Sequence, residues 1–279
     1  MFGISRQAYY KREKNHHQSK LKYSLILDLV DALRAKHPRL GTRKLHYLLQ
    51  PILKQEGIQI GRDALFYLLS EKGMLIRRRR KSGPKTTDAR FWSNQYPDLV
   101  NRVELPKSSQ VWVSDITYLT TKEGFAFLAL ITEVNSRKII GFQVSDSMET
   151  EQLCLPALRM ALIQTATVRS ENVIHHSDRG RQYLDKKYTR LLKAYGINIS
   201  MTQTGDPRDN AIAERVNGIL KYEYLIKPLK SIQHAQNNVE KAIKLYKTKR
   251  PHTTLNNKTP QEIFENHFKS PIFDLTKNT

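Results

Sequence analysis

Three acidic side chains stand out because each belongs to a different segment of the 279-residue chain. Asp115 lies inside an apolar, strand-like run, and Asp178 directly follows another such run. Glu214 lies in a helical pattern, with thirty-five residues, 179 to 213, between it and Asp178. An ionised carboxylate among apolar neighbours is costly to desolvate unless a cation compensates for its charge. The three acids are therefore candidates for a shared cation site.

Carboxylate oxygens are hard ligands of the kind that Mg²⁺ and Mn²⁺ prefer. Two such ions, roughly 3.5–4 Å apart, can activate an attacking oxygen and stabilise the leaving oxygen of a phosphodiester displacement. Each acid taken alone is better explained as a helix cap or a surface charge. Taken together, Asp115, Asp178 and Glu214 predict a catalytic site in which three carboxylates bind two divalent ions.

The helix that carries Glu214 presents further polar groups on the same side. At 100° per residue, Lys221 returns to within roughly 20° of Glu214. Asn217 lies between them on that side. Beside the second acid, Arg179 precedes a glycine that lets a substrate backbone approach. We therefore predict Lys221, Asn217 and Arg179 as contacts to DNA.

The segments around these acids alternate between strand and helix patterns. The expected strands are 111–119, 125–134, 138–144, 173–176 and 197–201, and the expected helices are 150–165, 186–195, 208–224 and 232–246. The short gaps between the first three strands favour an antiparallel meander. Three antiparallel strands, then helix, strand, helix, strand and helix, is the order of an RNase H-like α/β core, a five-stranded mixed sheet with flanking helices.

The front of the chain predicts a small all-α, helix-turn-helix-like domain before that core. Helical stripes at 24–36, from Thr42 onward and at 62–72 are separated by turns that contain proline or glycine. Such stripes would also suit any other small bundle. On the two later helices, the basic side chains Arg43 and Arg62 are candidate DNA contacts.

A basic linker follows this domain. It contains the run Arg77, Arg78, Arg79 and Arg80, and a Ser-Gly-Pro sequence that breaks helix comes soon after. Like charges keep such a segment extended, and we expect these arginines to contact phosphates rather than act as a solvated tether alone.

The expected domains are an N-terminal basic helix at 1–20, the helix-turn-helix-like domain at 21–76, the linker at 77–107, the catalytic core at 108–250 and a tail with a short helix at 251–279.

The composition indicates a polyanionic partner. The chain has 47 Lys and Arg against 26 Asp and Glu, a formal net charge of +21. The excess is +14 over residues 1–110 (23 against 9) and +7 over the remainder (24 against 17), so the front is the stronger electrostatic anchor for DNA.

We see no long apolar span that predicts a membrane segment and no secretory leader, so an intracellular protein is expected. A single cysteine, Cys154, excludes internal disulfides and Cys-based zinc clusters.

Three short motifs resemble those of the IS3-family transposases, which belong with the D,D-35-E transposases and retroviral-type integrases. The motifs are Trp112-Val-Ser-Asp-Ile-Thr-Tyr118, His176-Ser-Asp-Arg-Gly180 and Asp209-Asn-Ala-Ile-Ala-Glu214, the last followed by Leu220-Lys221 and Glu223. The tail sequence Lys249-Arg-Pro-His252 also looks like that family's ending. Two features depart from the pattern: Arg181 stands where a small polar residue is common, and the HHCC zinc module of retroviral integrases is absent.

The resemblance implies a Mg²⁺-dependent enzyme that nicks double-stranded DNA at the terminal repeats of a mobile element and joins the freed 3′-hydroxyl to target DNA. It implies that Asp115, Asp178 and Glu214 are the metal ligands and that Lys221 contacts DNA near the scissile phosphate. It also implies a homo-oligomer on DNA in a bacterial cytoplasm, associated with the nucleoid. In this family such a chain is often fused to, or acts with, an upstream-frame helix-turn-helix protein.

Two other functions stay open. A non-catalytic DNA-binding regulator would keep the fold and the charge, although retention of all three acids argues against it. An RNase H-like nuclease would use water as the only attacking group, and the sequence does not distinguish it from a strand-transfer enzyme. A serine hydrolase built on His175, His176, Ser177 and Asp178 is disfavoured, because adjacent strand residues point to opposite faces and no Gly-x-Ser-x-Gly turn occurs.

Overall fold

The computed structural model describes residues 5–76, 95–100, 110–166, 172–203 and 210–269. It divides into two compact units, Met1–Lys81 and Ser82–Thr279, each with its own hydrophobic core. The predicted DNA contacts Arg77, Arg78, Arg79 and Arg80, and most of the expected linker, lie outside the described residues. Within the part of the chain that is described, no helix is long and apolar enough to cross a membrane.

The first unit is formed by helices α1 (Arg6–Lys36), α2 (Thr42–Gln55) and α3 (Arg62–Glu71). Apolar residues at helical spacing pack together in its core, which includes Ile26, Val30, Leu45, Leu49, Leu53, Leu65, Leu68 and Leu69. Helices of 10 and 14 residues are marginal alone in water, so α2 and α3 depend on this shared core. The all-α character expected for this region is confirmed.

One prediction for this unit is wrong. The basic helix expected at 1–20 and the helix expected at 24–36 are a single helix, α1, which passes through position 20 without a break. Residues 15–23 contain no proline or glycine, so nothing in their backbone interrupts the ladder of hydrogen bonds. The side chains from Arg6 to His17 are exposed, and the core of the unit begins at Ile26.

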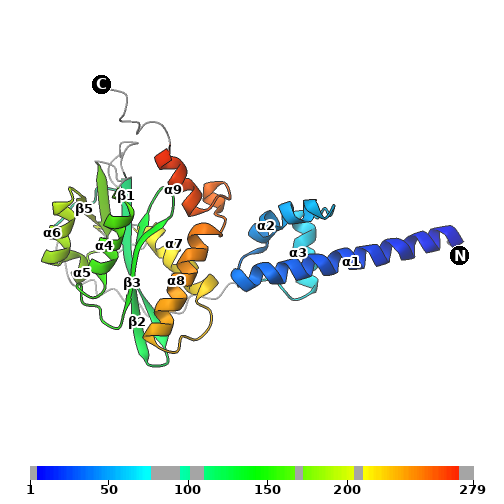
Figure 1. Ribbon diagram of the computed structural model, residues 1–279, viewed down its shortest axis with the longest axis horizontal. Coiled ribbons are helices and arrows are strands. Elements are labelled where there is room, and N and C mark those ends of the chain that lie inside the picture. The colour runs from blue at the N-terminus through cyan, green and yellow to red at the C-terminus, as the bar shows by residue number, and fades with distance from the viewer. Residues whose placement is uncertain (1–4, 77–94, 101–109, 167–171, 204–209, 270–279) are drawn as a thin grey trace, which may run out of the picture. The chain divides into compact units, whose positions relative to one another are not determined.

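The second unit is built on a five-stranded sheet (Figure 1). Its strands are β1 (Gln110–Thr121), β2 (Gly124–Glu133), β3 (Ile139–Ser145), β4 (Val173–Ser177) and β5 (Asn198–Met201). Their order across the sheet is β3-β2-β1-β4-β5. The first three strands pair antiparallel, and β4 and β5 are added in parallel. The mixed sheet of an RNase H-like core is therefore confirmed.

The helices of this unit follow the expected order, with two local differences. They are α4 (Cys154–Gln164), α5 (Arg181–Leu184), α6 (Lys186–Ala194), α7 (Ala211–Ile219), α8 (Ile232–Thr248) and α9 (Pro260–Lys269), with a short 3₁₀ turn, η3 (Thr253–Leu255). The short helix α5 was not predicted. The helix expected over 208–224 changes at Leu220 into a π-helix, η2 (Leu220–Tyr224).

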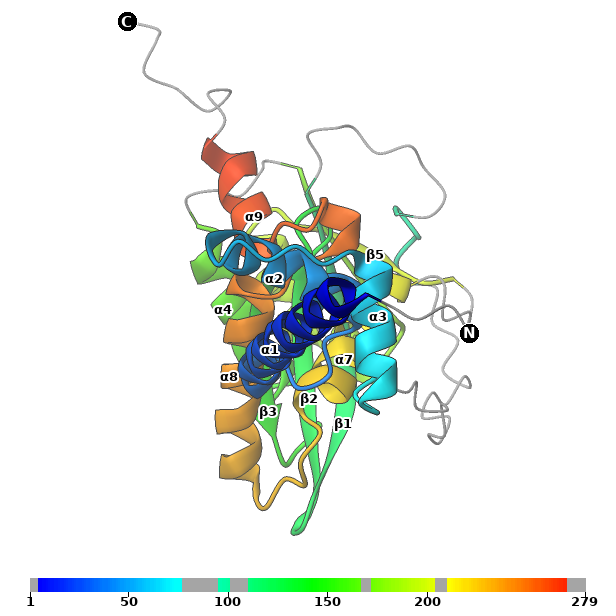
Figure 2. The same cartoon turned by 90° about the vertical axis from the view of Figure 1, so that its right-hand side faces the viewer.

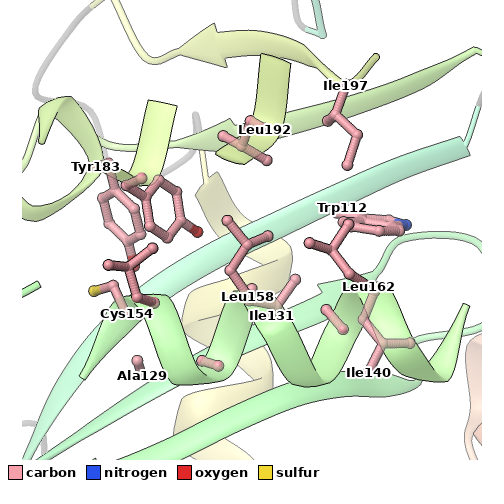
Figure 3. Close-up of a cluster of buried hydrophobic side chains, with 14 of the residues drawn as sticks. Trp112, Ala129, Ile131, Ile140, Cys154, Leu158, Leu162, Tyr183, Leu192 and Ile197 are labelled. Carbon is pink, nitrogen blue, oxygen red and sulfur yellow. The ribbon is translucent and has the colours of Figure 1, made fainter. Parts of the chain in front are cut away.

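Side chains alternate along each strand, so each strand presents residues to both faces of the sheet. Different helices pack on these two faces. On one face, Trp112 packs with Leu158 of α4 and Leu192 of α6 (Figure 3). On the other face, Leu130 packs in one cluster with Val216 of α7 and with residues of α8. Figure 2 shows β3, β2 and β1 side by side, with α8 next to β3. The odd-numbered positions in the middle of β1 therefore face α7.

Candidate active site

The parallel pairing of β1 with β4 brings the first two acids together. Val113 on β1 lies opposite His176 on β4. Two residues further along, Asp115 lies on β1 and Asp178 immediately follows the end of β4. Both residues are half-buried, and the negative charge of Asp178 acts on Asp115. The parallel register of β1 and β4 thus makes the two acids neighbours.

Helix α7 and its π-helical extension lie against the same face of β1. Asn217 Nδ2 donates to Asp115 Oδ2 at 2.7 Å. One turn later, Lys221 Nζ donates to Thr117 Oγ1 at 3.2 Å. Burial lowers the pKa of Lys221, and the negative charge of Asp115 offsets part of this shift. The helix therefore brings an amide and a cation to the side of Asp115.

The two aspartates are in an environment that favours their neutral forms. Burial and, next in size, the negative charge of Asp178 raise the pKa of Asp115 from 3.8 to about 7. The hydrogen bond from Asn217 lowers the pKa of Asp115, and the charge of Glu214 adds a smaller upward effect. Burial also raises the pKa of Asp178, although the Gly180 N–H, 3.0 Å from Asp178 Oδ1, lowers it. A cation placed between them would remove this penalty.

Glu214 occupies a different environment from the two aspartates. It lies in the first turn of α7 and is exposed. Its charge still acts on Asp115, so it lies within electrostatic range of that residue. Among the described residues, no three His, Cys, Asp or Glu side chains stand close enough together to hold a metal ion. The structure thus unites Asp115 with Asp178 and leaves Glu214 at the edge of the site.

The ligand types at this site suit a divalent metal, but the three acids do not stand close enough together to hold one. The donor set is made of carboxylate oxygens, which Mg²⁺ and Mn²⁺ prefer. The amide oxygen of Asn217 is buried without a hydrogen-bond partner, so a further oxygen lies beside Asp115. The long side chain of Glu214 is exposed and would have to turn inward to join the two aspartates. The residues fit the ion by type, and Glu214, which is exposed, is the one that stands apart from the two aspartates.

The predicted DNA contacts differ in how exposed their side chains are. Asn217 is buried and uses its amide on Asp115 instead of facing solvent. Arg179 is half-buried next to Asp178. In the helical unit, Arg43 is exposed in the first turn of α2. Arg62, the first residue of α3, is exposed and forms an ion pair with its neighbour Asp63 at 2.8 Å. None of these contacts is tested by the structure itself.

Two residues that position the acids were not predicted. Asn210 Nδ2 donates to the backbone oxygen of Ser114 at 2.9 Å, which ties the start of α7 to β1 beside Asp115. Thr117 accepts the hydrogen bond from Lys221. Alternation along β1 signals that Thr117 shares a face with Asp115. No spacing in the sequence signals the contact of Asn210, because it depends on where α7 approaches the strand.

The chain matches a known family over the region that carries this site. A family model described as "Integrase core domain" matches residues 106–207, and a second model with the same description matches residues 195–260. Together they span residues 106–260, which is 155 of the 279 residues. That span contains all three acids.

Curated relatives resemble the chain over different lengths. An insertion element IS600 uncharacterized 31 kDa protein from Shigella sonnei is 34% identical and covers 96% of this chain and 97% of its own. A putative transposase for insertion sequence element IS986/IS6110 from Mycobacterium tuberculosis is 36% identical, over 63% of this chain and 64% of its own. Transposase InsF for insertion sequence IS3A from Escherichia coli is 43% identical, over 41% of this chain and 39% of its own.

Solved structures of viral integrases also resemble the chain. The HTLV-2 integrase catalytic core domain in complex with magnesium covers 55% of this chain and 94% of its own, with 19% identity and a TM-score of 0.43. A simian T-cell lymphotropic virus intasome in complex with the PP2A regulatory subunit B56 gamma covers 80% of this chain and 74% of its own. Its identity is 17% and its TM-score is 0.48.

Proposed function

Since the chain belongs to the IS3 family of insertion-sequence transposases, we propose that it cuts DNA at the ends of a mobile element and joins those ends to target DNA at a magnesium-dependent D,D-35-E site. Family membership makes the chain a transposase with an integrase core, and hence a polynucleotidyl transferase that acts on DNA. The proposal adds the residues and the order of the chemistry. Asp115, Asp178 and Glu214 are its catalytic metal ligands.

The neighbouring aspartates carry this proposal. Asp115 lies on β1 and Asp178 directly follows the adjacent parallel strand β4. Two neighbouring half-buried acids with raised pKa values destabilise the folded protein unless a cation binds them. Two Mg²⁺ or Mn²⁺ ions, when bound, would activate the attacking oxygen and stabilise the leaving oxygen. Asp115 and Asp178 would hold the ions, and Asn217 would orient Asp115 by its hydrogen bond. Glu214 would complete the ligand set by turning its exposed side chain inward.

The proposed reaction consists of two phosphoryl transfers. In the first, a water oxygen attacks the phosphorus at the element end, the bond from phosphorus to the 3′ oxygen breaks, and that oxygen leaves as a 3′-hydroxyl after gaining a proton. In the second, this hydroxyl loses its proton and attacks a target phosphodiester, and the target's own 3′ oxygen leaves. The second step exchanges one phosphate ester for another, so it needs no oxidant and no energy-rich cofactor. Lys221 would contact the phosphate next to the reacting bond.

The proposed partner is double-stranded DNA, as terminal repeats and as target. The charge of +21 and the exposed Arg43 support this partner, and Arg62, Arg179 and the arginines at 77–80 are further candidate contacts. Joining two ends at one target requires at least two active sites, so we infer a homo-oligomer on DNA. Fusion to, or action with, an upstream-frame helix-turn-helix protein is part of the same proposal.

The test compares the parent protein with Asp115→Asn, Asp178→Asn and Glu214→Gln variants on labelled DNA from the ends of the element that encodes this chain. Each variant removes one carboxylate and keeps its shape. We expect the parent to release a 3′-hydroxyl and form joined products with Mg²⁺, and each variant to lose both by about a thousandfold or more. Glu240→Gln, which changes an exposed acid on α8, is the matched control and should keep full activity.

The products of this experiment separate the competing functions. Cleavage by the parent without any joined product would support a nuclease that only hydrolyses. DNA binding without cleavage, unchanged in all three variants, would support a non-catalytic regulator. Full activity in any one of the three variants would show that the corresponding acid is not a metal ligand.

A further inference from the structure

The turn that follows α7 has an uncommon geometry. From Leu220 to Tyr224 the chain forms the π-helix η2, and its closing bond runs from Leu225 N–H to Leu220 O at 2.9 Å. A π-turn is rare, interrupts a regular α-helix and is frequently found at functional sites. Lys221 lies inside this turn, so the geometry of the turn decides where its ammonium group lies.

A buried ion pair holds the same turn. Glu223 accepts two hydrogen bonds from Arg250, from Nε to Oε2 at 2.8 Å and from Nη2 to Oε1 at 2.7 Å. The Arg250 side chain is 1% exposed and that of Glu223 is 21% exposed. Arg250 Nη1 donates to Pro251 O at 3.4 Å and lies 3.2 Å from His252 Nε2. The guanidinium group is thus fixed on both sides.

This ion pair connects the π-turn to the segment that follows α8. Arg250 comes two residues after the end of α8, and Glu223 comes two residues after Lys221. A two-bonded arginine–carboxylate pair restricts both orientation and distance. The ion pair therefore also restrains the backbone at Lys221, two residues before Glu223. The Lys221 Nζ atom lies 3.2 Å from Thr117 Oγ1, and the charge of Asp115 acts on it.

We propose that Glu223 and Arg250 are positioning residues, whose ion pair holds the π-turn so that the Lys221 ammonium group lies beside Asp115 and Thr117. Arg250, in the Lys249-Arg-Pro-His252 sequence, thereby gains a role in the active site through Lys221. The inference rests on the proposed function for its catalytic consequence. Displacement of a catalytic group by about 1 Å is enough to slow a reaction on the order of a hundredfold.

The activity test is a double-mutant cycle between Arg250 and Lys221. Arg250→Lys keeps the positive charge but loses the planar two-bonded geometry. We expect Arg250→Lys to lower kcat for joining by about tenfold or more and to change KM for DNA less than about threefold. In a Lys221→Ala background the same substitution should have little further effect, because the group that it positions is already gone. Lys249→Arg, an exchange at the exposed neighbouring position, is the matched control.

A second measurement does not depend on activity. The Lys221 amine can be dimethylated with ¹³C-labelled methyl groups and its pKa followed by NMR. Burial lowers the pKa of Lys221 in the parent, and release of the turn should return it toward the ordinary value of 10.5 in Arg250→Lys and in Glu223→Gln. Near-ultraviolet circular dichroism and the melting temperature identify any variant that has lost its fold. If Arg250→Lys does not fold, Glu223→Gln takes its place in the cycle.

The outcomes are distinguishable from failure of the proposed function. A parent protein that neither cleaves nor joins DNA overturns the proposed function, and the NMR measurement still decides the positioning role. An active parent in which the effects of Arg250→Lys and Lys221→Ala are additive overturns the inference. An unchanged pKa of Lys221 in folded Arg250→Lys and Glu223→Gln protein overturns it as well.

Discussion

The carboxyl group of Asp115 is held where ionisation is unfavourable. Burial and the charge of Asp178 both raise the pKa of Asp115, and the hydrogen bond from Asn217 offsets only part of this rise. Groups with such shifts are frequent at functional sites, because a structure selected for stability alone would place an apolar side chain there. In the absence of a metal, Asp115 is therefore expected to reduce the stability of the fold at neutral pH.

Replacing Asp115 with asparagine should stabilise the metal-free protein at neutral and alkaline pH. The pKa of Asp115 is about 7 in the folded protein and 3.8 ordinarily, so its contribution to stability is fully present below about pH 4 and is lost as pH rises through 7. The advantage of Asp115→Asn should therefore grow from pH 4 to pH 8, to on the order of 3–4 kcal/mol. Urea unfolding in the presence of EDTA at several pH values measures it.

The control for this prediction is Glu240→Gln, which removes an exposed carboxylate on α8. Its unfolding free energy should follow that of the parent across the pH range. A stability difference between Asp115→Asn and the parent that does not change with pH would contradict the prediction. That result would mean that Asp115 ionises as easily in the folded protein as in the unfolded chain.

The site residues differ in how far the sequence could predict them. Asp115 and Asp178 could be predicted because each stands beside an apolar run whose strand character is plain. The exposure of Glu214 and the contact from Asn217 to Asp115 could not, because both depend on how α7 sits against β1. Helical periodicity gives the relative directions of residues around one helix. It does not say which of those directions meets the sheet.

At the scale of elements, local patterns predicted the sheet better than they predicted interruptions of helices. The five strands, and the antiparallel pairing of the first three, follow from apolar runs and short gaps. The π-helix η2 was not predicted, and the ion pair from its Glu223 to Arg250 joins residues that lie far apart along the chain. The boundary predicted near residue 20 is wrong because the stretch there is polar but contains no proline or glycine, and polarity alone does not end a helix.

The contact between β3 and α4 yields a prediction about stability. A Cβ atom added to Gly141 would lie 2.1 Å from the backbone oxygen of Ala157 and 3.0 Å from Ala161 Cβ. Backbone cannot move aside cheaply, so Gly141→Ala should lower the free energy of unfolding by about 3 kcal/mol or more. Denaturant unfolding of the full chain, followed by near-ultraviolet circular dichroism of the β-sheet unit, measures the loss.

Gly218→Ala is the matched control for this substitution. In α7 the added Cβ would come no closer than 3.9 Å, to Tyr222 Cδ2. The exchange of glycine for alanine inside a helix should therefore leave stability unchanged or raise it by up to about 1 kcal/mol. Equal losses in Gly141→Ala and Gly218→Ala would show that close packing of β3 on α4 is not what requires the glycine.

At the scale of the whole molecule, charge and chemistry are divided along the chain. Residues 1–110 carry a net charge of +14 (23 basic against 9 acidic), whereas the three acids of the site all lie after residue 110. The exposed half of α1 contributes to that excess without joining the core of its unit. An isolated exposed helix gains little from its own hydrogen bonds, so a partner that complements its charge would stabilise it. DNA phosphates are such a partner.

Replacing Lys11, Lys14 and Lys20, which are exposed on α1, with glutamine should weaken DNA binding in a salt-dependent way. Each phosphate contact to duplex DNA contributes about 0.9 to the slope of log K against log salt, so loss of three contacts would reduce the slope by up to about 2.7. Fluorescence anisotropy with duplex DNA over a roughly sixfold range of salt concentration, from about 50 to about 300 mM, measures that slope. The same three positions changed to arginine keep the charge and should keep the slope. If glutamine and arginine variants give equal slopes, the exposed half of α1 does not contact DNA, and the anchor lies elsewhere in the basic front of the chain.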